Sequence, residues 1–117
     1  MLRFVILEHD HPELHWDFML EANDSLRTWR LASVPVGGVA IAALKLADHR
    51  LAYLDHEGPV GGDRGSVTRW DHGVYEKRSE DESNLEVRLV GVKTQGIVRM
   101  TRLQAGWEWR WTEDVAI

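Results

Sequence analysis

The sequence contains no cysteine and only three prolines among its 117 residues. Without cysteine there are no disulfide bonds and no thiolate ligands, so a metal ion would have to be bound by His, Asp or Glu. No apolar run approaches the roughly 18 residues that a membrane-spanning helix needs. The apolar run near Met1 is short and lacks a cleavage region, so we expect a cytoplasmic protein with no membrane partner.

Basic residues are also in deficit. Lys and Arg number 14 against 19 Asp and Glu, and the formal net charge is −5. A nonspecific nucleic-acid-binding protein normally carries a basic surface, so this balance argues against that class. It still allows an enzyme that meets a nucleic-acid end through a metal ion and a local basic patch. The residues available for such a patch are Arg27, Arg30, Lys45, Arg50, Arg64 and Arg69, although each taken singly is typical of solvated surface.

The length suits one hydrophobic core, so we expect a single domain over residues 1–117. Short runs rich in β-branched and aromatic residues recur between turn signals, and hardly any segment has a helical period. This pattern predicts an antiparallel barrel or sandwich. The expected strands cover residues 3–8, 14–21, 26–31, 66–71, 74–76, 85–89, 96–102 and 107–111. Residues 71–73 are expected as a turn, 77–84 as a polar loop, and 39–47 as an apolar run ambiguous between strand and helix.

The richest segment chemically is E-H-D-H-P-E-L-H-W-D-F-M-L-E at residues 8–21, which holds three of the six histidines. Its alternation places Trp16, Phe18 and Leu20 on one face of a strand. The opposite face then carries His15, Asp17, Met19 and Glu21. We expect the first face to be core and the second to be a site.

Two residues of a strand on the same face lie about 6.6 Å apart, so His15 and Asp17 could bind one cation. His9, at the end of the first expected strand, could join them. Two imidazoles and one carboxylate suit Zn²⁺, Mn²⁺ or Fe²⁺ and leave positions for water or substrate. A helix would instead group His11, His15 and Met19, but Pro12 and the aromatic alternation disfavour it. Scattered histidines in a chain with six of them are also commonly surface residues, or core residues whose ring nitrogens are hydrogen-bonded.

Two other features have a functional and a structural interpretation. Trp107, Trp109 and Trp111 alternate along the last expected strand, and we favour core packing for them over a base-stacking platform. The glycine-rich segment 58–65 could cradle a phosphate through backbone N–H groups. No P-loop lysine and hydroxyl follow it, so a flexible connection is the favoured interpretation.

Residues 8–21 resemble a signature of the 3′-phosphoesterase domain of bacterial ATP-dependent DNA ligase D, roughly K-H-D-x-x-x-L-H-[YW]-D-F-R-L-E. Residues 47–58, A-D-H-R-L-A-Y-L-D-H-E-G, are similar to its second signature, E-D-H-P-L-x-Y-x-x-F-E-G. Residues 67–75 also resemble its V-x-x-W-D-x-G-x-[WY] segment. The likeness covers most of the chain. It implies a strand at residues 39–47 and an all-β fold: a small closed or partly open antiparallel β-barrel of about seven or eight strands.

The resemblance also implies a divalent-metal-dependent phosphoesterase that removes a 3′-phosphate or 3′-ribonucleotide from a nucleic-acid end in DNA end repair. By carry-over, His9, His15 and Asp17 bind the metal, for which we expect Mn²⁺, with Zn²⁺ as the alternative. His49 and Tyr53 act at the phosphate. The expected substrate-binding residues are Met19, Glu21, Arg27 and Arg64. An ATP-dependent DNA ligase or a polymerase is the implied protein partner.

Three departures from the family pattern support a rival interpretation. Met19 stands where the family has arginine, the glycine-rich loop is shorter, and the lysine of a K-G-P-S segment is missing near Val34 and Pro35. An arginine binds phosphate bidentately, whereas a thioether is only a weak acceptor. The rival is a catalytically impaired relative that acts as a metal-binding nucleic-acid-end or protein-interaction module. A two-histidine, one-carboxylate iron oxygenase shares the ligand types but has no resemblance to support it.

Overall fold

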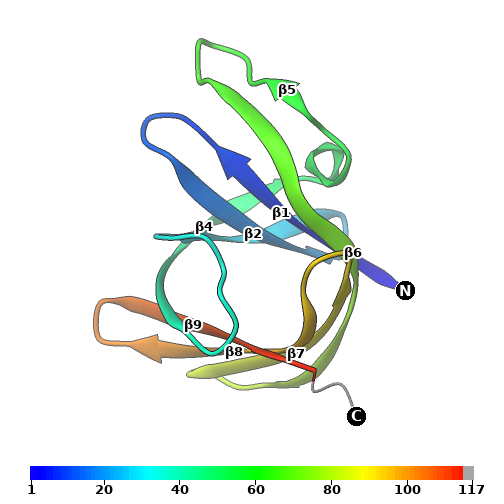
Figure 1. Ribbon diagram of the computed structural model, residues 1–117, viewed down its shortest axis with the longest axis vertical. Coiled ribbons are helices and arrows are strands. Elements are labelled where there is room, and N and C mark those ends of the chain that lie inside the picture. The colour runs from blue at the N-terminus through cyan, green and yellow to red at the C-terminus, as the bar shows by residue number, and fades with distance from the viewer. Residues whose placement is uncertain (115–117) are drawn as a thin grey trace.

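The computed structural model describes residues 1–114, which form nine strands and one short 3₁₀ helix (Figure 1). No helix among these residues is long and apolar enough to cross a membrane. The elements are β1 Leu2–His9, β2 His15–Ala22, β3 Ser25–Leu31, β4 Ala40–Arg50, η1 Leu51–Leu54, β5 Gly58–Pro59, β6 Ser66–Glu80, β7 Asn84–Gly91, β8 Gln95–Leu103 and β9 Gly106–Glu113.

All strand pairs are antiparallel, and the sheet closes on itself. The strand order is β1-β2-β3-β4-β9-β8-β7-β6-β5, and β1 also pairs with β6. Eight strands therefore form a closed barrel, and β5 lies outside the ring on the edge of β6 (Figure 1). This confirms the expected all-β antiparallel barrel. Closure removes the exposed sheet edges that open sheets must protect.

The barrel interior is a large aromatic and aliphatic core. It contains Phe18, Trp29 and Trp109 in edge or tilted contact, surrounded by apolar side chains that come from all eight barrel strands. Trp109 and Trp111 are buried, and Trp107 packs against them, so the tryptophan stripe of β9 serves core packing as expected. Trp29 is likewise a core residue.

A second apolar cluster lies outside the barrel, against β1, β2 and β3. Its buried members are Val5, Leu7, Met19, Leu26, Leu54 and Val67, with Leu54 contributed by η1. The run Phe4–Leu7 is therefore buried on both faces of β1, as unbroken apolar strands commonly are. The face of β2 expected to hold only a site is thus partly a covered apolar surface.

The expected turn at residues 71–73 is wrong, because β6 continues through it for 15 residues to Glu80. Part of the expected loop 77–84 is consequently strand. Irregularities in register at Trp70 and Arg78 bend β6 so that it can pair with β1 and then with β7. Gly73 supports this path, since a Cβ there would overlap the backbone of Val90 on β7.

Asp71 is a buried structural anchor rather than a turn residue. One carboxylate oxygen accepts hydrogen bonds from Val92 N and Lys93 N, each at 2.9 Å. The other accepts from the backbone N of Thr94 at 2.8 Å and from its hydroxyl. The Trp-Asp-x-Gly segment therefore secures the β7–β8 turn from a neighbouring strand.

We predict that Asp71→Asn lowers the free energy of unfolding by about 3 kcal/mol. The amide would turn one acceptor oxygen into a donor facing other donors, and hydrogen bonds to charged groups contribute roughly 1.5–3 kcal/mol each. Urea denaturation followed by tryptophan fluorescence measures the change. Asp81→Asn is the control, because Asp81 also accepts from two turn amides but is exposed. An equal loss in both variants would contradict the anchoring role.

Candidate metal centre

The loop end of the β1–β2 hairpin brings three donor side chains together. In its register His9 pairs with His15, and Leu7 pairs with Asp17. Residues directly opposite each other in an antiparallel pair carry their side chains on the same face. His9, His15 and Asp17 therefore project from neighbouring positions on the outer face of the barrel. A one-residue slip would send them to the interior.

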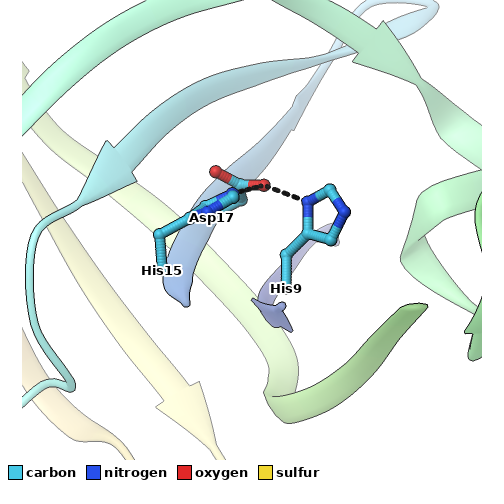
Figure 2. A group of neighbouring side chains, drawn as sticks. All are labelled: His9, His15 and Asp17. Atoms are coloured by element: carbon cyan, nitrogen blue, oxygen red, sulfur yellow. Dashed lines mark hydrogen bonds and ion pairs between the residues drawn. The ribbon is translucent and has the colours of Figure 1, made fainter. Parts of the chain in front are cut away.

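Their donor atoms converge on one point, as Figure 2 shows. His15 Nε2 lies 3.2 Å from Asp17 Oδ2, and His9 Nδ1 lies 3.9 Å from the same oxygen. One ligand atom from each residue falls within 4.8 Å of the others. His15 and Asp17 are buried, and His9 is half-buried.

Backbone carbonyls determine how both imidazoles are oriented. His15 Nδ1 is 2.8 Å from Glu13 O, and His9 Nε2 is 2.7 Å from Arg64 O. A carbonyl oxygen can only accept, so these two nitrogens carry the hydrogens. In the neutral rings the remaining nitrogens, which face Asp17, then present lone pairs. Such outer hydrogen bonds are the usual means of orienting a metal-binding histidine.

With neutral rings, two lone pairs and a carboxylate oxygen face one another and repel; a proton on His15 Nε2, which makes its contact with Asp17 a hydrogen bond, or a bound cation relieves this repulsion. The second carboxylate oxygen, Asp17 Oδ1, is also buried without a hydrogen-bond partner among the described residues. A divalent cation satisfies all of these atoms, and two imidazoles with one carboxylate form a donor set for Mn²⁺, Zn²⁺ or Fe²⁺. The residues present therefore fit a metal ion.

The glycine-rich segment 58–65 contacts the residues of the centre through its backbone. Its first residues form β5, and it returns over the hairpin so that the carbonyl of Arg64 reaches His9. Asp10 Oδ1 accepts from Ser66 N at 2.8 Å and ties the two loops together. Gly65 has a φ of +73°, and a Cβ there would overlap Asp10 and His11. The expected flexible connection is thus a contact surface for the hairpin loop.

A cavity of about 100 Å³ adjoins the centre. It is lined by Leu7, His9, Asp17, Met19, His49, Tyr53, Val60, Arg64 and Val67. His49 and Tyr53 come from the end of β4 and from η1, with their rings 5.9 Å apart in an edge-to-face arrangement. His49 Nδ1 lies 2.9 Å from Ala47 O, so Nδ1 donates and Nε2 remains for a ligand. The fold therefore brings the second signature to the first.

The four expected substrate-binding residues divide into two pairs. Met19 and Arg64 line the cavity, although Met19 is only 1% exposed within the outer apolar cluster. Glu21 and Arg27 lie elsewhere among the described residues. The Glu21 carboxylate accepts from Arg3 N, and Arg27 makes two hydrogen bonds to Glu80. Arg27 points to the barrel interior, since it also lies over the Trp29 ring.

Two backbone carbonyls of the site were missed from the sequence, and Arg30 was named only as one of six residues available for a basic patch. The carbonyls of Glu13 and Arg64 leave no signal, because every residue has one. Arg30 did leave a signal: the two-residue turn Asn23-Asp24 sets the β2–β3 register and places Arg30 directly opposite Asp17. Its Nε lies 4.0 Å from Asp17 Oδ1.

Comparison with known proteins gives consistent matches. A family model described as the DNA Ligase D 3′-phosphoesterase domain matches residues 7–102. The chain is 32% identical over 91 residues to the multifunctional non-homologous end joining protein LigD of Pseudomonas aeruginosa, covering 74% of this chain and 11% of that protein. It is 33% identical over 91 residues to the multifunctional non-homologous end joining DNA repair protein LigD of Mycobacterium tuberculosis, covering 72% and 12%. The chain thus spans only a small fraction of the length of these relatives.

We predict that Mn²⁺ or Zn²⁺ stabilises the protein against unfolding and that His15→Ala abolishes the effect. A ligand that binds only the folded state at 100 times its Kd contributes about 2.7 kcal/mol. Thermal unfolding with metal and with EDTA, together with elemental analysis, measures this. His72→Ala, a histidine of β6 outside the cluster, should behave as wild type. Unchanged metal stoichiometry in His15→Ala would contradict a metal site at His9, His15 and Asp17.

Proposed function

This chain belongs to the DNA ligase D 3′-phosphoesterase domain family, and from that premise we propose that it is a divalent-metal-dependent phosphoesterase acting on nucleic-acid 3′ ends. The substrates would be a 3′-phosphate or a 3′-ribonucleotide at a DNA end. The observation that carries the proposal is the convergence of His9, His15 and Asp17 beside a cavity that also holds His49 and Tyr53.

His9 Nδ1, His15 Nε2 and an Asp17 oxygen would hold the cation, Mn²⁺ in the first instance and Zn²⁺ as the alternative. When bound, the ion would supply positive charge to the phosphoryl oxygens, which favours attack at phosphorus. Glu13 and Arg64 keep the two imidazoles in the ligating tautomer through their carbonyls. Three members of the outer apolar cluster, Leu7, Met19 and Val67, form an apolar part of the cavity wall.

His49 and Tyr53 would act on the phosphate from the opposite wall of the cavity. In hydrolysis of a 3′-phosphate, a water oxygen bonds to phosphorus and the bond between phosphorus and the 3′ oxygen breaks. The products are inorganic phosphate and a 3′-hydroxyl. Protonated at Nε2, His49 could give its proton to the departing 3′ oxygen, while the water proton passes to solvent. The Tyr53 hydroxyl would donate a hydrogen bond to a phosphoryl oxygen.

The second candidate is an impaired relative that binds nucleic-acid ends or another protein without turnover. The observation in its favour is Met19, which is buried among aliphatic side chains where the family has a phosphate-binding arginine. Losing one transition-state contact of that kind typically costs about 10²- to 10³-fold in rate. This candidate keeps the metal and loses the chemistry. A DNA ligase or polymerase partner is proposed under either candidate on the precedent of the family.

We predict Mn²⁺-dependent release of phosphate from a primer–template with a 3′-phosphate, and a drop of at least about 10²-fold in kcat for His49→Ala, because general acid–base groups contribute about 10²- to 10⁴-fold. Tyr53→Phe should lower the rate less. Phosphate release with and without EDTA measures both. Arg99→Ala, which removes an exposed arginine of β8, is the matched control.

The same assay separates the two candidates. If the protein is an active phosphoesterase, the wild type releases phosphate and Met19→Arg does not raise the rate. If the protein is an impaired relative, the wild type releases no phosphate and Met19→Arg raises the rate. Turnover that survives EDTA or His49→Ala unchanged would contradict the proposed function.

A further inference from the structure

We propose that Arg30 is a substrate-binding residue of this site, with its guanidinium bound to a phosphoryl oxygen of the nucleic-acid 3′ end. The assignment rests on the proposed function and deepens it. It gives this chain a phosphate-binding cation on β3, where the sequence alone shows only one of several surface arginines.

Strand register places Arg30 beside the metal-binding carboxylate. Arg30 and Asp17 are directly paired between β2 and β3, so both project from the outer face of the barrel. Arg30 Nε lies 4.0 Å from Asp17 Oδ1. This separation is too long for a hydrogen bond, so the two groups form a long ion pair that is not hydrogen-bonded.

Both facing atoms lack partners. Arg30 Nε and Asp17 Oδ1 are each buried with no hydrogen bond among the described residues. The Arg30 side chain is nevertheless 39% exposed, so the end of the guanidinium reaches solvent beyond its buried Nε. With a cation at the carboxylate, two positive groups would lie side by side, and an anionic ligand would relieve their repulsion.

Space for that ligand lies beside Arg30. A second cavity of about 240 Å³ is lined by Pro12, Glu13, Leu14, His15, Arg30, Leu31 and Ala32. His15 lines this cavity, and His9 and Asp17 line the first one, so the metal centre lies between the two. A phosphoryl group at the cation can therefore be contacted by His49 from one side and by Arg30 from the other.

Other arginines near the hairpin fit this role less well. Arg27 is committed to Glu80 through two hydrogen bonds and faces the barrel interior. Arg64 lines the first cavity, but its Nε donates to Gly61 O at 2.6 Å and its carbonyl serves His9. Arg30 combines proximity to Asp17 with a guanidinium that makes no hydrogen bond within residues 1–114. A planar guanidinium also matches two phosphoryl oxygens at once.

The test measures, by fluorescence anisotropy, the affinity of the Mn²⁺-loaded protein for two DNA duplexes. One DNA duplex ends in a non-hydrolysable 3′-methylenephosphonate, and the other ends in a 3′-hydroxyl. Wild type should prefer the phosphonate, and Arg30→Ala should lose about 10- to 100-fold of that preference, as expected for a charge-assisted contact. Arg30→Lys should recover part of it, and Arg99→Ala should keep all of it. The Mn²⁺ affinity of Arg30→Ala should stay within about twofold of wild type.

Each contrary outcome has a distinct meaning. A preference retained in Arg30→Ala, beside a wild type that shows it, would overturn the assignment and leave the proposed function standing. A parallel loss of Mn²⁺ affinity would also overturn it, because Arg30 would then only position Asp17. A wild type with no preference for the phosphonate would refute the substrate class, and with it both proposals.

Discussion

The antiparallel register between β1 and β2 is the constraint on which the candidate site depends. It pairs His9 with His15 and Leu7 with Asp17, so that His9, His15 and Asp17 share one face of the sheet. Backbone carbonyls of Glu13 and Arg64 then hold each imidazole with its lone pair toward Asp17. The barrel supplies the rigid sheet, and the returning segment 58–65 supplies the second carbonyl. Ligand geometry thus follows from strand pairing and two outer hydrogen bonds.

The position of the site outside the barrel follows from how the apolar residues are divided. The interior is filled by tryptophans and other buried apolar side chains. Val5, Leu7 and Met19 instead form a small outer cluster that is closed by Leu54 of η1. Covering this cluster draws η1 over the sheet, and with it Tyr53 and the nearby His49. The same packing that buries Met19 therefore assembles the cavity beside the candidate metal centre.

The alternation of apolar and polar residues along the strands predicted most of the candidate metal centre. The parity of residues 14–21 placed His15 and Asp17 together, and the end of the first strand delivered His9. The Asp71-His72-Gly73 signal failed because its local pattern is that of a turn. The Asp71 carboxylate actually binds a turn more than twenty residues away, which no short window of sequence reveals. Glu21 and Arg27 were assigned to the substrate; in the structure Glu21 accepts a hydrogen bond from the backbone of Arg3 and Arg27 pairs with Glu80, and their contact with substrate stays a prediction.

The claim that the two imidazoles and Asp17 form a metal centre is tested most directly by crystallography at the manganese absorption edge. An anomalous difference map of crystals soaked in Mn²⁺ should show one peak bonded to His9 Nδ1, His15 Nε2 and an Asp17 oxygen. Manganese–ligand distances of about 2.0–2.3 Å, as for comparable divalent ions, would support the account. A fully soaked crystal with no peak at these three residues, or with the ion bound elsewhere, would contradict it.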